Sequence, residues 1–361
     1  MNHEKTYQTV IWDAQAEFER ATDAGAALLR QGALVAFPTE TVYGLGADAC
    51  NERAVAAIYA AKGRPSDNPM IVHVASVEQA ERLAVLTPLA RALMAAFWPG
   101  PLTLILEDRG VVTPAVRGGV SSLGVRMPAH PVALALIQKS GVPVAGPSAN
   151  RSGRPSPTQA AHVWEDLQGR IPMILDAGTV KGGVESTVLS LLQAQPTILR
   201  PGLVTPDMIS NIVGEVALGP SLLEAWTGEG NAASPGVKYK HYAPRAQVLL
   251  VAGEGQGQRN ALLAQYDQAL QNGKRTLILA TCENAPFYGD RNYAIMGRKE
   301  DAAALCHALF SLLRQADADG MEVVLIEAIP AKEGGLAFMN RALRAAAFQV
   351  IQPSPSPRSG E

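Results

Sequence analysis

Short apolar runs alternate with amphipathic stretches along the first part of the chain. A buried strand needs only a few consecutive apolar residues, whereas apolar residues three or four positions apart predict one face of a helix. The sequence therefore predicts strands at 33–37, 70–74, 102–106, 123–128, 142–145, 172–176, 182–190 and 197–202, and helices at 14–30, 51–61, 88–98, 131–139 and 158–167. This mixture predicts an α/β domain, a twisted mixed sheet whose strand ends surround a central crevice.

The same alternation returns near the C-terminus in a smaller set of elements. Strands are expected at 246–251, 275–280 and 322–327, and helices at 258–271, 300–315 and 336–346. Strands that alternate with helices predict a parallel sheet, so we expect a smaller, Rossmann-like α/β domain here. The glycines that follow its first strand do not match a dinucleotide-binding fingerprint.

Two stretches lack this pattern. One lies between the two predicted domains, and the other follows the second domain. Residues 219–236 are rich in Gly, Ser and Pro, which is typical of a linker. They run directly into 237–244, where Lys, Tyr and His are dense, so we expect a lid that folds onto the crevice. The predicted boundaries are 1–217 for the catalytic domain, 218–244 for the linker or lid, 245–352 for the second domain and 353–361 for a disordered tail.

Composition narrows the class of protein. The 361 residues are 47% hydrophobic and 18% charged, as in a well-packed globular protein, and this length favours two domains. A net charge of −2 and only 5% aromatic residues argue against a protein that grips nucleic acid by bulk charge or by stacking. The sequence shows no signal peptide or membrane span, and Cys50, Cys282 and Cys306 lack metal-site spacing. We therefore expect a soluble cytoplasmic protein with no metal site of its own.

The strongest candidate for chemistry is a basic stretch that precedes the apolar run 70–72. Lys62 and Arg64 lie two positions apart, and on an extended backbone their side chains would point the same way. A guanidinium and an ammonium that converge suit a phosphate or a carboxylate. The alternative for such a pair alone is a solvated basic turn.

Polar residues recur at the ends of the predicted strands, where a rigid scaffold commonly holds binding loops. Thr41 follows the strand at 33–37, and Ser148 and Asn150 follow the strand at 142–145, although each could simply belong to a turn or cap. His73, taken alone, is more often structural than a ligand-binding residue. Arg126 lies among apolar residues and needs a partner, from the protein or a ligand. A further strand end carries Arg200, and the glycines at 182–183 resemble a main-chain anion nest.

Taken together, four motifs resemble one family. They are the segment 37–45 (FPTETVYGL), the Lys62/Arg64 pair, the Ser148/Asn150 pair, and the segments 234–236 and 239–244 (SPG, YKHYAP). Together these motifs are similar to those of the YrdC-related threonylcarbamoyl-AMP synthases. The match is to the long form, in which a tyrosine-bearing linker joins a C-terminal domain, and it covers essentially the whole chain. The resemblance implies a YrdC-like fold and a nucleotidyltransferase that converts L-threonine, bicarbonate or CO2 and ATP into threonylcarbamoyl-AMP and pyrophosphate.

The resemblance also implies roles for individual residues. Lys62, Arg64, Ser148 and Asn150 would be catalytic and would hold the phosphates of ATP and the reacting carboxylate. The threonine site would comprise Thr41, His73, Arg126 and Ser186. Further contacts to ATP would come from Asn68, Ser156, Arg200 and one of two linker tyrosines, Tyr239 or Tyr242. The family varies at Gly146, where some members offer a hydroxyl to the ligand, whereas glycine offers only its main chain.

Partners and alternatives follow from the same comparison. Mg²⁺ is expected on the phosphates of ATP and pyrophosphate. A downstream transferase would pass the threonylcarbamoyl group to the adenosine beside the tRNA anticodon, so tRNA is involved only indirectly and no membrane is involved. One alternative is an RNA-binding or ribosome-associated factor with the same fold. Another is carbamoyl transfer in hydrogenase maturation, which the absence of a CxxC spacing disfavours.

Overall fold

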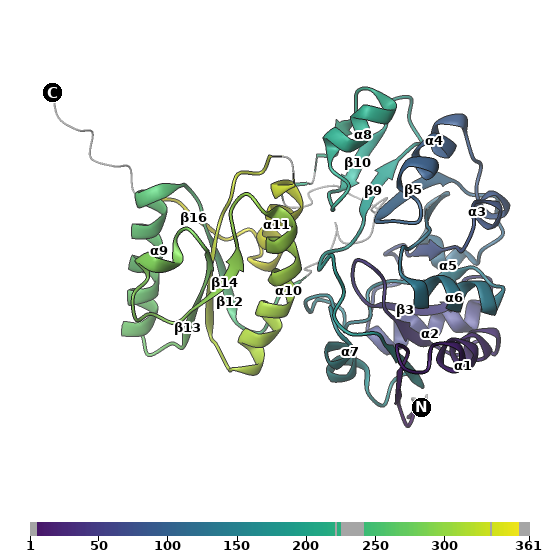
Figure 1. Cartoon of the computed structure of the whole chain (residues 1–361), viewed down its shortest axis with the longest axis horizontal. Coiled ribbons are helices and arrows are strands. Elements are labelled where there is room, and N and C mark those ends of the chain that lie inside the picture. Colours follow the sequence, from purple (N-terminus) through teal and green to yellow (C-terminus); the bar gives the residue numbers. More distant parts are fainter. Residues whose placement is uncertain (1–5, 221, 225–241, 333, 354–361) are drawn as a thin grey trace. The chain divides into compact units, whose positions relative to one another are not determined.

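The structure, a computed structural model, describes residues 6–220, 222–224, 242–332 and 334–353. These residues divide into an N-terminal unit, mainly 6–222, and a C-terminal unit, mainly 242–353 (Figure 1). Each unit has its own sheet and its own hydrophobic core. Most of the predicted linker or lid and most of the predicted tail lie outside the described residues.

The described residues of the N-terminal unit form an eleven-stranded mixed sheet. From edge to edge its strands are β1 (Val10–Asp13), β8 (Met173–Asp176), β2 (Val35–Phe37), β3 (Gly44–Asp48), β7 (Val144–Ala145), β4 (Ile71–His73), β6 (Ser122–Arg126), β5 (Leu102–Glu107), β9 (Thr187–Ser190), β10 (Thr197–Arg200) and β11 (Ala217–Leu218). Parallel and antiparallel pairs alternate irregularly, since β4 is parallel to β6 but antiparallel to β7. The predicted mixed sheet is confirmed.

Helices connect and cover these strands. They are α1 (Phe18–Arg30), α2 (Glu52–Lys62), α3 (Val77–Leu83), α4 (Pro88–Phe97), α5 (Pro114–Arg117), α6 (Pro131–Ser140), α7 (Ala160–Leu167) and α8 (Pro206–Val213). The helix α1 packs against α6, and apolar residues from both join β2, β7 and β8 in one core. This packing buries Leu29, Phe37, Leu136 and Val144 completely, which fixes the strands that carry the candidate site.

Local sequence sets the ends of the helix that matters most for the site. The side chain of Asn51 accepts hydrogen bonds from the amides of Arg53 and Ala54 and so caps α2. Gly63 ends the helix with φ of 61°, a left-handed conformation that glycine adopts without a steric penalty. As a result, Lys62 is the last residue of the helix.

The C-terminal unit is a three-layer α/β domain built on a five-stranded parallel sheet. Its strands are β14 (Tyr293–Gly297), β13 (Thr276–Thr281), β15 (Val323–Glu327), β12 (Gln247–Val251) and β16 (Val350–Ile351), in that spatial order. Figure 1 shows α9 (Gly255–Gln271) on one side of this sheet and α10 (Ala302–Ala318) and α11 (Gly335–Ala345) on the other. A short 3₁₀ helix, η1 (Ala285–Phe287), follows β13. The predicted Rossmann-like parallel arrangement is confirmed.

Several elements differ from their predicted form, and β3 differs most. No strand was predicted over residues 44–48, and glycines such as Gly44 and Gly46 generally weaken a strand. In the structure the strand pairs with β2, and the ring of Phe37 lies across both glycines: Cβ atoms added at Gly44 and Gly46 would lie 3.1 Å and 2.9 Å from that ring. The aromatic ring therefore supplies the packing that the glycines lack.

The start of α1 also differs from its prediction. A helix was expected from residue 14, but it begins at Phe18. The carboxylate of Asp13 accepts hydrogen bonds from the amides of Gln15 and Ala16, both at 2.9 Å, and this local bonding replaces the first helical turn. The short strand β1, the helix α8 and the edge strands β14 and β16 were not predicted.

Within the described ranges, the structure contains no helix long and apolar enough to cross a membrane.

The C-terminal core contains a buried carboxylate whose removal should be costly. Glu327 is fully buried and accepts hydrogen bonds from the Thr281 amide at 3.0 Å, the Thr281 hydroxyl at 2.6 Å and the Tyr288 hydroxyl. We expect Glu327→Ala to lower the free energy of unfolding by about 3 kcal/mol, because it leaves these buried donors unsatisfied. Urea titration measures this change. The exposed Glu300→Ala should stay within about 0.5 kcal/mol of the wild type, and equal losses in both variants would contradict the role of the network.

Candidate active site

Neighbouring strands bring His73 and Arg126 side by side. The strands β4 and β6 run parallel, and His73 and Arg126 are register partners at their C-terminal ends. On its other side, β4 pairs with β7, which leads into the turn that carries Ser148 and Asn150. The amide of Gly146 donates to the carbonyl of Ile71, so this turn begins directly beside β4. Because β7 is antiparallel to β4, this turn lies beside the start of β4, whereas His73 and Arg126 lie at the other end of β4 and β6.

The turn 148–150 surrounds the ammonium of Lys62. This ammonium donates to the carbonyl oxygens of Ser148 and Asn150, the latter at 2.6 Å, and reaches the side-chain oxygen of Asn150 at 3.5 Å. The hydroxyl of Ser148 also donates to that side-chain oxygen. Lys62 is 2% exposed, so these oxygens compensate a charge that water does not reach. Three of the four predicted catalytic residues thus form one cluster.

The predicted geometry of the Lys62/Arg64 pair is wrong in its premise. Their backbone is not extended, because Lys62 ends α2 and Gly63 turns the chain. Arg64 instead donates to the carbonyl oxygens of Asn68, at 3.2 Å, and Pro69, at 2.8 Å. Its guanidinium therefore closes the loop 64–69, and a shared anion for the two cations stays a prediction.

The loop that carries Asn68 rests on α5. The hydroxyl of Tyr59 donates to the carbonyl of Ala115 at 2.7 Å and lies 3.4 Å from that of Asn68. Gly118, with φ of 58°, follows α5, and a Cβ atom there would lie 2.8 Å from the main-chain nitrogen of Pro69. Only glycine permits this close approach.

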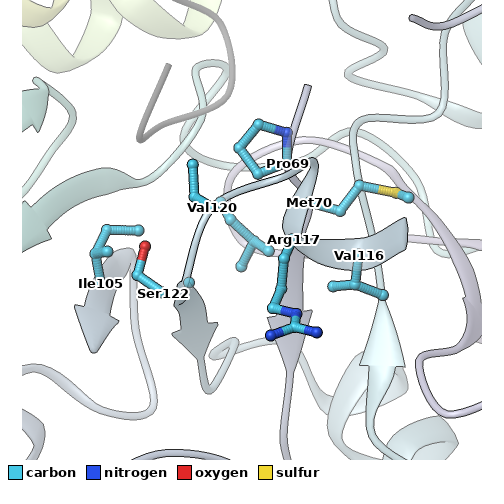
Figure 2. Close-up of a pocket in the computed structure, with 9 residues that line it drawn as sticks. Pro69, Met70, Ile105, Val116, Arg117, Val120 and Ser122 are labelled. Carbon is cyan, nitrogen blue, oxygen red and sulfur yellow. The ribbon is translucent and has the colours of Figure 1, made fainter. Parts of the chain in front are cut away.

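A small pocket lies beside the same loop. Figure 2 shows Pro69 and Met70 on one side and Val116 and Arg117 on another, with Ile105, Val120 and Ser122 completing the lining. The space leaves room for little more than a water molecule. It is far too small for a nucleotide or an amino acid, so it is a packing gap next to the candidate site.

Arg126 has a protein partner. Its guanidinium forms an ion pair with Glu40 at 2.7 Å, and its Nε donates to the carbonyl of Gly100 at 3.2 Å. Glu40 accepts a further hydrogen bond from the amide of Ala129 at 3.0 Å. The need of a buried cation for a partner was evident from the sequence, but Glu40 was not identified as that partner because it is remote along the chain.

His73 is buried in its neutral form. Burial, and after it the charge of Arg126, lower the pKa of His73 from 6.5 to about 3, against an opposing hydrogen bond with the main chain of Val144. Its ring packs edge-on against Phe37, and its Nδ1 has no hydrogen-bond partner among the described residues. A Cβ atom at Gly146 would lie 2.8 Å from this Nδ1, so glycine leaves room for the ring.

Thr41 belongs to a hydroxyl pair in the connection between β2 and β3. Its hydroxyl lies 2.8 Å from that of Thr39, which donates to the carbonyl of Val42. The carbonyl of Thr41 accepts a hydrogen bond from the amide of Gly183, and that of Glu40 accepts one from Gly182. The predicted anion nest at these glycines is therefore wrong, because carbonyl oxygens already occupy both amides.

One contact joins the two predicted subsites. Arg200, predicted for ATP, donates to the hydroxyl of Ser186 at 3.2 Å and to its carbonyl at 3.1 Å, and Ser186 is predicted for threonine. The Ser186 hydroxyl also lies 2.8 Å from that of Thr103. Both Arg200 and Ser186 are buried.

Ser156 lies close to this contact. Its buried hydroxyl donates to the carboxylate of Glu185, the residue before Ser186. Glu185, like Glu40 and Thr103, was not singled out from the sequence. A buried carboxylate next to a candidate residue is the signal that would have found it.

The two linker tyrosines have different outcomes. Tyr239 lies outside the described residues. Tyr242 is 4% exposed in the C-terminal unit, where its ring stacks on Phe310 at 5.0 Å and lies 5.7 Å from the guanidinium of Arg341. A contact between Tyr242 and ATP would require the ring to leave this stack, and it stays a prediction.

The described part of the chain holds no group of three or more His, Cys, Asp or Glu side chains that could bind a metal ion. Cys50, Cys282 and Cys306 all lie in the described ranges and form no disulfide, and of the three only Cys306 is buried.

Comparisons with known proteins cover nearly the whole chain. A family model described as "Telomere recombination" matches residues 27–202, and one described as "Threonylcarbamoyl-AMP synthase, C-terminal domain" matches residues 204–347. The threonylcarbamoyl-AMP synthase of Bacillus subtilis is 46% identical over 91% of this chain and 93% of that protein, and that of Pyrococcus abyssi is 43% identical over 91% and 94%.

Solved structures agree with this result. The crystal structure of P. abyssi Sua5 complexed with L-threonine superposes with a TM-score of 0.87 at 40% identity and covers 96% of this chain and 99% of that one. The fold is thus that of a two-domain nucleotidyltransferase. This chain belongs to the threonylcarbamoyl-AMP synthase family, in the form that carries the C-terminal domain. The resemblance drawn from four sequence motifs is confirmed.

The close approach at Gly118 generates a first prediction for the site. Gly118→Ala adds a side chain that displaces the Pro69 main chain, so amide hydrogen exchange across residues 64–70 should accelerate by about tenfold. Gly110→Ala is the matched control, because Gly110 also has positive φ, of 75°, but nothing within 4 Å of an added Cβ. If exchange of this loop were equally fast in both variants, strain from the positive φ would explain it, and the contact of residue 118 with Pro69 would not.

The buried neutral His73 generates a prediction about pH. Because its folded-state pKa of about 3 lies below the unfolded value of 6.5, the unfolded chain binds the proton first as the pH falls. Stability should therefore decrease below about pH 6.5, by about 2 kcal/mol from this residue between pH 7 and pH 5. Urea unfolding at both pH values measures it. The His73→Gln variant should lose correspondingly less free energy of unfolding over the same interval. A pH dependence equal to that of the wild type would refute the lowered pKa of His73.

Proposed function

We propose that this chain synthesises threonylcarbamoyl-AMP and pyrophosphate from L-threonine, ATP and bicarbonate or dissolved CO2, with the residues described above. The observation that carries the assignment is the contact of Arg200 with Ser186. This contact joins a residue predicted for ATP to one predicted for threonine, as a reaction between the two substrates requires.

The threonine subsite is assigned to Thr41, His73, Arg126 and Ser186. The guanidinium of Arg126 suits the carboxylate of the amino acid, since it offers a planar fork of donors. His73 is neutral at physiological pH, so it offers one ring nitrogen as a donor or acceptor without repelling the substrate amine. The related P. abyssi Sua5 complexed with L-threonine supports this substrate.

The nucleotide subsite is assigned to the cluster around Lys62 and the loop that follows it. Lys62, with Ser148 and Asn150, presents an ammonium, a hydroxyl and an amide at one turn. The remaining predicted contacts to ATP come from Arg64, Asn68, Ser156, Arg200 and a linker tyrosine, Tyr239 or Tyr242. The linker itself is proposed as a lid that excludes water from a labile intermediate.

The reaction needs positioning and charge stabilisation more than a protein nucleophile. The deprotonated amine of threonine attacks the carbon of CO2 and releases a proton, which gives a carbamate. A carbamate oxygen then forms a bond to the α-phosphorus of ATP while the bond to the pyrophosphate oxygen breaks. Negative charge gathers around the α-phosphate in this step, and Lys62 and Arg64 stabilise it.

Mg²⁺ is proposed to arrive with ATP. The described residues offer no cluster of carboxylates or histidines that would hold the ion alone. This fits Mg²⁺, which commonly keeps several waters and binds the phosphates of its substrate with few protein ligands. The ion would neutralise charge on the departing pyrophosphate.

Downstream steps complete the proposal. Threonylcarbamoyl-AMP is a mixed anhydride, so a transferase must take its threonylcarbamoyl group, and the acceptor is the adenosine next to the tRNA anticodon. The synthase itself need not contact tRNA. An RNA-binding factor is not favoured, because the relatives reported above are threonylcarbamoyl-AMP synthases.

Pyrophosphate release tests the function. Release from ATP should require L-threonine and bicarbonate together and should be absent when either is omitted. Lys62→Met keeps the aliphatic stem but removes the charge at the turn, so we expect release to fall by about 100-fold or more. Lys274→Met, at an exposed position in the C-terminal unit, should leave it unchanged. Release without threonine, or full activity of Lys62→Met, would contradict the proposal.

A further inference from the structure

Glu40 occupies an unusual position between the sheet and the threonine subsite. It lies in the connection from β2 to β3, directly before Thr41, and its side chain is only 16% exposed. One carboxylate oxygen lies 2.7 Å from the guanidinium of Arg126, and the other accepts a hydrogen bond from the amide of Ala129. Both oxygens thus face groups at the end of β6 and just after it, the first through an ion pair that lacks hydrogen-bond geometry and the second through a hydrogen bond.

The main chain at Glu40 is held by a different segment, the turn at 182–183. Its carbonyl accepts a hydrogen bond from the amide of Gly182 at 2.8 Å, and the next carbonyl accepts one from Gly183 at 3.0 Å. A Cβ atom at Gly182 would lie 2.8 Å from the Glu40 carbonyl oxygen, so the two segments touch. The carboxylate therefore extends from a backbone that cannot shift easily.

Arg126 depends on this carboxylate for its orientation. It is 4% exposed at the end of β6, and its Nε also donates a hydrogen bond to the carbonyl of Gly100. An ion pair on one part of the guanidinium and a carbonyl at Nε together fix the plane of the group. Without the carboxylate, a nearly buried cation would lose its charge partner and could rotate.

We propose that Glu40 is a positioning residue of the threonine subsite: it holds the guanidinium of Arg126 in the orientation that receives the carboxylate of an α-amino acid. This inference rests on the proposed function, since it assumes that Arg126 binds that carboxylate. Glu40 acts through Arg126 and contacts no substrate. Its loss should therefore weaken threonine binding while leaving ATP binding nearly unchanged.

The test separates positioning from a purely structural role. Glu40→Gln keeps the volume and an acceptor for Ala129 but removes the charge, so the KM for L-threonine should rise about tenfold, and Glu40→Ala should raise it about 100-fold. The KM for ATP should change less than about twofold in either variant. Glu81→Gln is the matched control, because it removes an exposed partner of Arg91 and should change neither constant.

A second variant checks that Glu40 acts through Arg126. In an Arg126→Gln background, Glu40→Gln should cause no further loss of threonine binding in a calorimetric titration. An unchanged threonine KM in Glu40→Gln would overturn the inference, as would equal losses for threonine and ATP. If Glu40→Ala fails to fold, Glu40→Gln decides alone. A wild-type protein that neither binds threonine nor releases pyrophosphate would instead refute the proposed function.

Discussion

A cation buried in a protein must find its countercharge or its hydrogen-bond acceptors within the fold, and the candidate site is built on that constraint. Lys62 meets it with the carbonyl oxygens of the turn 148–150, Arg126 with Glu40, and Arg200 with Ser186. The contacts of Lys62 and Arg126 tie together segments that are remote in sequence, and the contact of Arg200 joins the consecutive segments that contain β9 and β10. The same bonds that make the charges tolerable therefore also hold the strand ends in place.

This arrangement has consequences for chemistry. The groups that would stabilise an anionic transition state are already oriented before substrates arrive, because packing and hydrogen bonds fix them. The carboxylate of threonine and the phosphates of ATP would bring further negative charge to these cations, and the contact of Arg200 with Ser186 joins the two predicted subsites. A reaction without a protein nucleophile depends on such positioning more than on any one reactive side chain.

The sequence was informative where its signals are local. Apolar runs predicted most of the sheet, and the four motifs predicted the family that the comparisons confirm. The sequence was less informative where packing between distant segments determines the structure. The strand β3 depends on Phe37 covering two glycines, and the partner of Arg126 is a glutamate far away along the chain. The Lys62/Arg64 geometry failed for a local reason, since Gly63 ends a helix there instead of continuing an extended segment.

In the proposed reaction, carbon from bicarbonate joins the amine of threonine and the α-phosphate of ATP at this site. The most direct measurement is mass spectrometry of the product formed from ATP, L-threonine and carbon-labelled bicarbonate. We expect threonylcarbamoyl-AMP with the label in its carbamoyl carbon. Production of AMP and pyrophosphate without a labelled threonylcarbamoyl adduct would contradict it.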